Sequence, residues 1–254
     1  MLPNVSRFAR RTYRSLHKRV AGTPAMRERM SDLSADDLDI LGQVAPYTMV
    51  APERLYAYIT AVRHVAQHDI PGAIVECGVW KGGASMAAML ALRSIECEDR
   101  EFYLYDTYEG MSAPTEHDRC HDGRAAAQKF KLVRIDDTSS DWCRAEIDGV
   151  KQAILSTGYA ANKIHFVKGK VEDTIPKTLP AQIAILRLDT DWYESTVHEL
   201  RHLYPNLVAG GVLLIDDYGH WRGARKAVDE YLASNKICML LHRDDYTGRS
   251  GIKI

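Results

Sequence analysis

The most constraining feature of the chain is a glycine-rich turn that joins a short apolar run to a helix-forming run. Residues 73–75 are apolar and lead into Glu76, and the turn closes at Gly82 and Gly83 before the helix-forming residues 84–93. Glycines let a backbone approach a ligand closely, and the free N–H groups at a helix N-terminus can bind it. This stretch therefore predicts a strand–turn–helix unit that holds a ligand.

The acidic residue at the end of the predicted strand narrows the choice of ligand. The Glu76 carboxylate would repel a phosphate, but it suits a ligand that carries hydroxyls and a positive centre. The spacing of Glu76, Gly78, Gly82 and Gly83 is closer to the turn of S-adenosylmethionine enzymes than to the dinucleotide pattern G-x-G-x-x-G. A tight turn in an unrelated α/β protein is the alternative, so this motif alone leaves the ligand open.

Strand-like and helix-like runs alternate along the rest of the chain. Strands are expected at 102–105, 163–167, 183–188 and 212–215, with a final pair of edge strands at 237–241 and 250–254. Helices are expected at 52–68, 192–204 and 223–233, with a helical insertion around 132–155. Because strands separated by helices form a mostly parallel sheet covered on both faces, we expect an α/β fold with antiparallel pairing at its C-terminal edge.

Two local signals mark the helices that precede the glycine-rich turn. Ser34 and Asp37 have the spacing of a helix N-cap, and Pro52 suits the first turn of a helix. Leu55, Ile59 and Val62 then recur at the spacing of an apolar helix face. We therefore expect the helix at 52–68 to pack against the sheet.

The composition limits the partners and the location of the protein. The 254 residues carry a formal net charge of −1, which favours neither a nucleic acid nor an anionic membrane as a partner. The apolar runs are too short to span a bilayer. The five cysteines are scattered and form no C-x-x-C pair, which favours reduced thiols in the cytoplasm over disulfides or a zinc site.

The N-terminal part of the chain is basic and differs from the rest. The basic side chains in this part are Arg7, Arg10, Arg11, Arg14, His17, Lys18 and Arg19. A targeting peptide or a nucleic-acid-binding arm is possible for such a segment, but no other basic patch follows it. We therefore interpret residues 1–43 as a helical arm or lid and residues 44–254 as the main domain.

Acidic residues follow four of the predicted strands. These residues are Glu76, Asp106, Asp189 and the pair Asp216 and Asp217. In an open parallel sheet, ligands bind outside the carboxyl ends of the strands. Asp106 lies one strand–helix unit after Glu76, so it is placed to accept the two hydroxyls of a ribose, or alternatively to cap the turn that follows it. A nicotinamide cofactor would use the same residue, so Asp106 does not identify the ligand.

The aspartates after two later strands form a second group. Asp189 and Asp191 follow one predicted strand, and Asp216 and Asp217 follow another. Carboxylates this close raise one another's pKa values unless a cation offsets their charge, and the sequence shows no lysine cluster nearby. Mg²⁺ is the simplest partner, because hard cations prefer oxygen ligands. Capping of the following helices without any metal is the alternative.

Five segments together resemble the TylF-like, or macrocin, O-methyltransferases, a family that acts mainly on sugar hydroxyls of natural products. The resemblance covers roughly residues 44–234. Its motifs are Pro-Tyr-Thr-Met at 46–49, Glu-Cys-Gly-Val-Trp-Lys-Gly-Gly at 76–83, Tyr-Asp-Thr-Tyr-Glu-Gly-Met at 105–111, Leu-Arg-Leu-Asp-Thr-Asp-Trp-Tyr-Glu-Ser-Thr at 186–196, and Gly-Gly-Val-Leu-Leu-Ile-Asp-Asp-Tyr at 210–218.

The resemblance implies a Rossmann-like class I methyltransferase sheet, an S-adenosylmethionine cofactor and a Mg²⁺ ion. It also implies that Asp189, Asp216 and Asp217 bind the metal and that Asp189 is the catalytic base. The residues expected to bind or surround the cofactor are Thr48, Met49, Glu76, Gly78, Gly82, Ser85, Asp106, Thr107, Gly169 and Asp189. An oligomer, either a dimer or a tetramer, is expected from the same resemblance.

Two departures from the family pattern leave the methyl acceptor open. The chain has Asp-Thr-Asp-Trp-Tyr at 189–193, where family members tend to have glycine at the second position, and His220-Trp221 follows the paired aspartates. His220 is a second candidate base, whereas His198 and His202 lie one helical turn apart and suit a solvated helix face.

We therefore expect a Mg²⁺-assisted O-methyltransferase acting on a sugar or a glycosylated natural product. A catechol acceptor is an alternative, because a catechol chelates Mg²⁺ as a vicinal diol does. An NAD-dependent oxidoreductase and a non-enzymatic binding module are alternatives of other classes.

Overall fold

The computed structural model of the chain describes residues 30–137 and 139–254. Seven strands among the described residues form one sheet in the order β3-β2-β1-β4-β5-β7-β6. The strands are β1 (Ala73–Cys77), β2 (Phe102–Asp106), β3 (Ile164–Lys168), β4 (Ile183–Leu188), β5 (Leu207–Ile215), β6 (His242–Arg243) and β7 (Arg249–Ile252). The first five are mutually parallel where they pair, and β7 runs antiparallel to both β5 and β6, which confirms the predicted fold class.

The final edge strand lies later in the sequence than we predicted. The expected strand at 237–241 is absent from the described sheet, and β6 begins at His242. The turn between β6 and β7 sets this register, because the Asp245 carboxylate accepts hydrogen bonds from the backbone N–H groups of Thr247 and Gly248 at 2.8 and 2.6 Å. A tight turn at this place brings Arg243 opposite Arg249.

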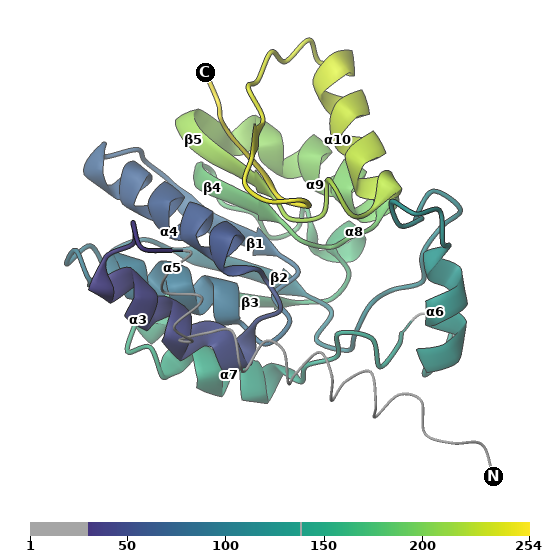
Figure 1. The fold of residues 1–254 in the computed structure, drawn as a ribbon, viewed down its shortest axis with the longest axis horizontal. Coiled ribbons are helices and arrows are strands. Elements are labelled where there is room, and N and C mark those ends of the chain that lie inside the picture. The colour runs from purple at the N-terminus through teal and green to yellow at the C-terminus, as the bar shows by residue number, and fades with distance from the viewer. Residues whose placement is uncertain (1–29, 138) are drawn as a thin grey trace.

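Helices cover both faces of the sheet (Figure 1). One face carries α3 (Ala35–Val44), α4 (Pro52–Gln67), α5 (Gly83–Arg93) and α7 (Ile147–Leu155). The other face carries α8 (Val171–Thr174), α9 (Tyr193–Leu203) and α10 (Arg222–Ser234). Three short 3₁₀ turns, η1 (Ala45–Tyr47), η2 (Ala161–Lys163) and η3 (Tyr204–Asn206), join these elements. Another of the described helices, α6 (Ala126–Val133), lies apart from the two layers, in the insertion after β2.

Both helix signals read from the sequence are confirmed. The Ser34 hydroxyl accepts a hydrogen bond from the Asp37 backbone N–H at 3.1 Å and caps α3. The next helix, α4, begins at Pro52, and its apolar face, which includes Ile59 and Val62, is fully buried. An N-terminal proline fits because the first N–H groups of a helix have no partner within it.

The helix α3 packs into the core of the main domain. Its Ile40, Leu41 and Val44 are buried together with residues of α4 and α5. Residues 35–43, which we assigned to the N-terminal arm, therefore include core positions. The basic segment at 7–19 lies outside the described residues.

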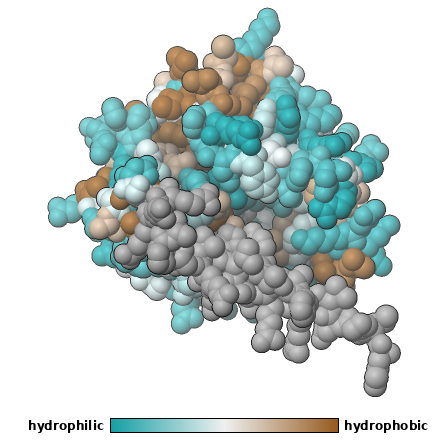
Figure 2. Space-filling model, viewed as in Figure 1, coloured by the Kyte–Doolittle hydropathy of each residue, from teal (hydrophilic) through white to brown (hydrophobic). Residues whose placement is uncertain are grey.

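Much of the visible surface is hydrophilic, with separate apolar patches (Figure 2). The exposed large apolar side chains include Leu240 and Ile254 near the C-terminus. Among the described residues, no helix combines the length and the apolar character needed to cross a membrane.

We predict that the buried central strand controls stability. Leu186 in β4 is fully buried, so Leu186→Ala should lower the free energy of unfolding by about 2–5 kcal/mol through lost apolar burial and a residual cavity. Urea denaturation measures this change. The matched control is Leu240→Ala, because Leu240 is 88% exposed and its truncation should change stability by less than about 0.5 kcal/mol. Equal losses in the two variants would contradict the assigned core.

Candidate active site

The carboxyl ends of four neighbouring strands meet at one edge of the sheet. Cys77 at the end of β1 pairs with Tyr105 on β2 and with Leu188 on β4, and Leu188 pairs with Ile215 on β5. The acidic residues predicted to follow these strands are therefore brought together. The structure thus forms a single acidic site from segments that are far apart in the sequence.

The glycine-rich turn is shaped by the close approach of β1 to β4. The Asp189 backbone N–H donates to the Cys77 carbonyl at 2.8 Å. Gly78 has a φ of +88°, and a Cβ atom there would collide with the Asp189 carbonyl oxygen. Gly82, with a φ of +86°, then ends the turn and forms the N-cap of α5. Only glycine meets both demands at Gly78, the left-handed conformation and the close backbone contact.

Asp106 holds the glycine-rich turn in place. One oxygen, Oδ2, accepts hydrogen bonds from the backbone N–H groups of Val79 and Trp80 at 2.7 and 2.8 Å. The other oxygen, Oδ1, accepts from the Tyr108 N–H at 2.7 Å. Burial raises the pKa of Asp106, and these three hydrogen bonds oppose that rise. Asp106 therefore caps the turn that follows it, as one of its two predicted roles requires, and binding of a ribose stays a prediction.

The other predicted cofactor residues near Asp106 surround it closely. The Thr107 hydroxyl donates to the Gly110 carbonyl at 2.7 Å, and the Gly169 N–H donates to the Asp106 carbonyl at 3.0 Å. Across the turn, a Cβ atom on Gly83 would lie 2.7 Å from the Thr48 Cβ atom. The segment that carries Thr48 and the partly exposed Met49 therefore lies against the start of α5.

Glu76 and Ser85 lie beneath the turn instead of lining it, which corrects our expectation for them. Both residues are buried, with exposures of 1% and 0%. The Ser85 hydroxyl donates to Glu76 Oε2, and the Arg187 guanidinium donates to Glu76 Oε1 at 2.9 Å. They support the turn from within, because their polar atoms are already hydrogen-bonded to the protein.

Arg187 is the cation that our reasoning from the sequence missed. It lies within β4 and donates to three carboxylates, those of Glu76, Asp189 at 2.8 Å and Asp216 at 2.6 Å. Burial lowers the pKa of Arg187, but Asp189 and Glu76 raise it by more, so the guanidinium stays charged. The signal was present in the sequence as an arginine within an otherwise apolar strand run.

Asp216 does not join the candidate metal ligands in this structure. Its Oδ1 atom accepts from Arg187 at 2.6 Å, and its Oδ2 atom accepts from Arg54 on α4. The Arg54 Nε atom also donates to Asp245 Oδ2 at 3.0 Å, which ties α4 to the β6–β7 turn. Because both oxygens of Asp216 are paired with guanidinium groups, we replace Asp216 with Asp191 in the predicted ligand set.

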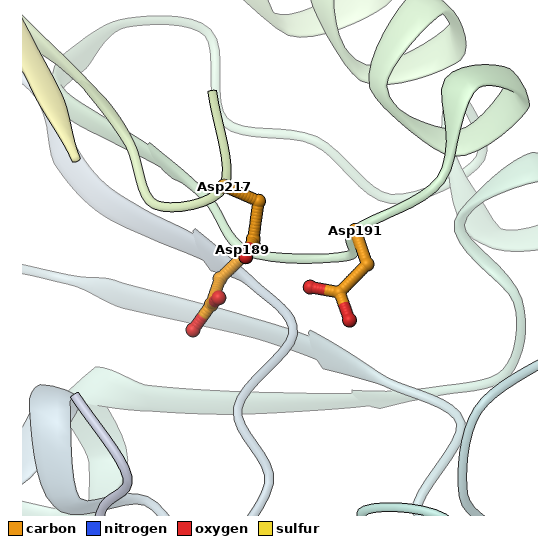
Figure 3. A group of neighbouring side chains, drawn as sticks. All are labelled: Asp189, Asp191 and Asp217. Carbon is orange, nitrogen blue, oxygen red and sulfur yellow. The ribbon is translucent and has the colours of Figure 1, made fainter. Parts of the chain in front are cut away.

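Three carboxylates converge beside this network (Figure 3). Carboxylate oxygens of Asp189, Asp191 and Asp217 lie within 4.8 Å of one another. Asp217 Oδ2 is buried and has no hydrogen-bond partner among the described residues. Burial raises the pKa of Asp189 to about 7, that of Asp191 to about 6, and that of Asp217 well above its ordinary value. Three convergent oxygens with an unpartnered buried atom fit a hard divalent cation such as Mg²⁺.

His220 follows this group along the chain, but its ring faces the insertion. Its Nδ1 atom lies 3.2 Å from the Tyr246 hydroxyl, and its Nε2 atom lies 3.8 Å from Cys120 Sγ. Burial lowers the pKa of His220, and the nearby His121 lowers it further. A role as a base would require one ring nitrogen to exchange its present partner for the acceptor hydroxyl.

The insertion after β2 forms the wall next to Asp191. Trp142 from the insertion packs against Trp192 and Trp221, with ring centroids 5.5 and 6.0 Å away. Asp118 is fully buried, and its Oδ1 atom accepts from the Tyr193 N–H at 2.8 Å at the start of α9. Reasoning from the sequence also missed Asp118, because nothing in its local motif indicates a partner 75 positions away.

Residues 4–250 match the family model described as macrocin O-methyltransferase (TylF). The chain belongs to this family. The chain is also similar to the demethyldecarbamoylnovobiocin O-methyltransferase of Streptomyces niveus, with 31% identity over 191 residues, or 75% of this chain and 70% of that protein. The mycinamicin III 3''-O-methyltransferase of Micromonospora griseorubida is 30% identical, and the match covers 73% of this chain and 70% of that protein.

A solved structure of the O-methyltransferase NovP has the same fold. It superposes with a TM-score of 0.71 at 27% identity, and the match covers 95% of this chain and 98% of that chain. The predicted family, the class I methyltransferase fold and the enzyme class are thereby confirmed. Membership in this family leaves no support for the oxidoreductase and the non-enzymatic binding module.

We predict that Arg187 stabilises the whole acidic edge. Arg187→Met should lower the free energy of unfolding by about 3–5 kcal/mol, because it leaves buried carboxylates without their cation. The control is Arg144→Met, which removes an exposed ion pair with Glu146 and should cost less than about 1 kcal/mol in a urea titration. A loss no larger than that of the control would rule out this role for Arg187.

The raised pKa values predict an unusual pH dependence for the metal-free protein. Burial raises the pKa of Glu76 and of Asp189 from 4.5 and 3.8 to about 7. Because the folded state then binds protons more tightly than the unfolded state, stability should fall as the pH rises from about 4.5 to about 7. The urea midpoint in metal-free buffer measures this fall, and Asp189→Asn should reduce it. A midpoint that rises over this interval would contradict the prediction.

Proposed function

We propose that this TylF family member transfers a methyl group from S-adenosylmethionine to a hydroxyl of a sugar or a glycosylated natural product, with assistance from Mg²⁺. The observation that carries the proposal is the convergence of Asp189, Asp191 and Asp217 beside the glycine-rich turn. A methyl donor held at the turn and a hydroxyl held at the carboxylates would be neighbours. The names of the curated relatives, which include a 3''-O-methyltransferase, support a saccharide acceptor.

Residues around the turn would hold the cofactor. Asp106 would accept the ribose hydroxyls, because its carboxylate is fixed by the N–H groups of Val79 and Trp80. Thr48 and Met49 would cover the cofactor from the side of α5. Glu76 would act from below through its buried contact with Arg187. The turn then orients the donor methyl toward the edge of the sheet where the carboxylates lie.

The three carboxylates would hold Mg²⁺, which when bound lowers the pKa of a hydroxyl and orients it. Asp189 is the candidate base for the hydroxyl proton, since burial raises its pKa to about 7, close to a working pH. Arg187 donates to Asp189 Oδ2 and so fixes the direction of its carboxylate. The buried tryptophans, including Trp192 and Trp221, exclude water from this side of the site.

The proposal extends to the organisation of the protein. The predicted arm or lid at 1–43 would then be limited to the residues before α3, because Ile40 and Leu41 of α3 pack into the core of the main domain. The enzyme would work in the cytoplasm as a homo-oligomer, either a dimer or a tetramer. Size-exclusion chromatography with light scattering tests the oligomer directly.

Calorimetric titration tests the cofactor and the metal. We expect binding of S-adenosylmethionine and not of NAD, and binding of Mg²⁺ that chelator abolishes. Asp189→Asn and Asp217→Asn should weaken Mg²⁺ binding by more than the roughly 10- to 100-fold that loss of an outer-shell partner costs. Their affinity for S-adenosylmethionine should stay close to that of the unaltered protein, as should all affinities of the surface control Asp229→Asn, whose carboxylate is exposed.

Two further experiments identify the metal ligands and the class of acceptor. Asp191→Asn and Asp216→Asn separate the two ligand sets, because only the true ligand should be needed for Mg²⁺ affinity once stability is accounted for. A panel of rhamnosides, other glycosides and catechols identifies the acceptor class through methyl transfer from labelled cofactor. Full turnover in excess chelator would rule out the metal, and binding of NAD without S-adenosylmethionine would sink the whole proposal.

A further inference from the structure

Two candidate metal ligands lie on one short turn, and that turn needs support. Asp189 and Asp191 flank Thr190 between β4 and α9 (Figure 3). Asp191 has a φ of +70°, in the left-handed region that most residues with a Cβ atom avoid and that aspartate tolerates better than most. Such a conformation persists only where the surrounding contacts determine it. The position of Asp191 relative to Asp189 therefore depends on what holds the turn between them.

A fully buried glutamate holds the turn at its middle residue. The Thr190 hydroxyl donates to Glu199 Oε1 on α9 at 2.9 Å. After this residue, the Trp192 N–H donates to the Thr190 carbonyl at 2.8 Å, and Asp118 accepts from the Tyr193 N–H. Asp118 of the insertion therefore holds the first residue of α9, and Glu199 of α9 holds the turn that precedes it.

A fully buried glutamate at position 199 lowers stability unless its hydrogen bond to Thr190 compensates for the burial. It has no exposed surface, and its Oε2 atom has no hydrogen-bond partner among the described residues. A buried polar group with an unsatisfied atom lowers stability relative to an apolar side chain. Leu200 and Leu203, also on α9, are fully buried in the apolar core, so a leucine could also pack at position 199. The hydrogen bond to the turn is what an apolar side chain would lose.

We propose that Thr190 and Glu199 form a positioning pair that sets the separation and direction of Asp189 and Asp191. The hydrogen bond from the Thr190 hydroxyl to Glu199 would fix the middle of the turn, with one candidate ligand on each side of it. The proposal rests on the metal role of these aspartates. Neither Thr190 nor Glu199 is proposed to bind the metal itself, because both act through the turn that carries Asp189 and Asp191.

Three variants separate positioning from packing. Thr190→Val keeps the shape of the side chain and removes its hydroxyl, whereas Thr190→Ser keeps the hydroxyl and loses a methyl group. Glu199→Gln keeps the carbonyl acceptor for Thr190, and it matches the neutral acid that burial favours by raising the pKa of Glu199 well above its ordinary value. Thr190→Val should weaken Mg²⁺ binding by about 10- to 100-fold. Thr190→Ser and Glu199→Gln should bind Mg²⁺ nearly as well as the unaltered protein.

The full-length protein is titrated with Mg²⁺ alone and, separately, with S-adenosylhomocysteine, and its thermal midpoint is recorded. Thr190→Val should keep its affinity for S-adenosylhomocysteine, because the Thr190 hydroxyl donates to Glu199 and not to the glycine-rich turn. Equal Mg²⁺ affinities for Thr190→Val and the unaltered protein would overturn the proposal. It would also be overturned if Thr190→Ser lost as much affinity as Thr190→Val, because packing would then explain both.

Amide hydrogen exchange over residues 189–193 gives a readout that needs no metal. Thr190→Val should speed exchange of these amides, whereas Thr190→Ser and Glu199→Gln should not. If the unaltered protein binds no Mg²⁺ but exchange follows this pattern, the metal function fails and the positioning pair stands. Unchanged exchange in Thr190→Val removes the positioning pair, whatever the metal does.

Discussion

The buried guanidinium of Arg187 is the interaction on which the rest of the site depends. The carboxylates at this edge of the sheet come from β1, β2, β4 and β5 or from the loops that follow them, and without a cation they would repel one another. Arg187 pairs with Glu76 below the glycine-rich turn, with Asp189 at the candidate metal group and with Asp216 after β5. A single side chain therefore fixes the relative positions of the two halves of the site.

Around that cation, the proposed cofactor half and the proposed acceptor half of the site are built by different means. The cofactor half is a backbone structure, in which Gly78 permits a close approach and Asp106 collects the N–H groups of the turn. The acceptor half is a side-chain structure, in which aspartates and tryptophans from distant segments converge. The first half suits a ligand common to many enzymes, and the second suits one that differs between relatives.

The sequence predicted the fold and the edge of the sheet on which the site lies, because both follow from local patterns. Buried parallel strands read as apolar runs, and acidic residues just after such runs must meet at one edge. The sequence did not predict which carboxylates would form ion pairs with arginines. Arg187 lies 111 positions from Glu76 and Arg54 lies 162 positions from Asp216, so no local spacing could assign them. The same limit hid Asp118 and Glu199, and it led us to select Asp216 where the geometry favours Asp191.

The docking of the insertion has a consequence for how acceptor preference changes among relatives. Asp118 of the insertion accepts a hydrogen bond from the backbone N–H of Tyr193, the first residue of α9. Trp142 of the insertion packs against Trp192 and Trp221. The insertion and the turn that carries Asp191 are therefore packed together as one unit. If the insertion contacts the acceptor as proposed, replacing it alone would also remove the contacts of Asp118 and Trp142 that support the start of α9. The insertion and the turn between β4 and α9 would therefore have to change together.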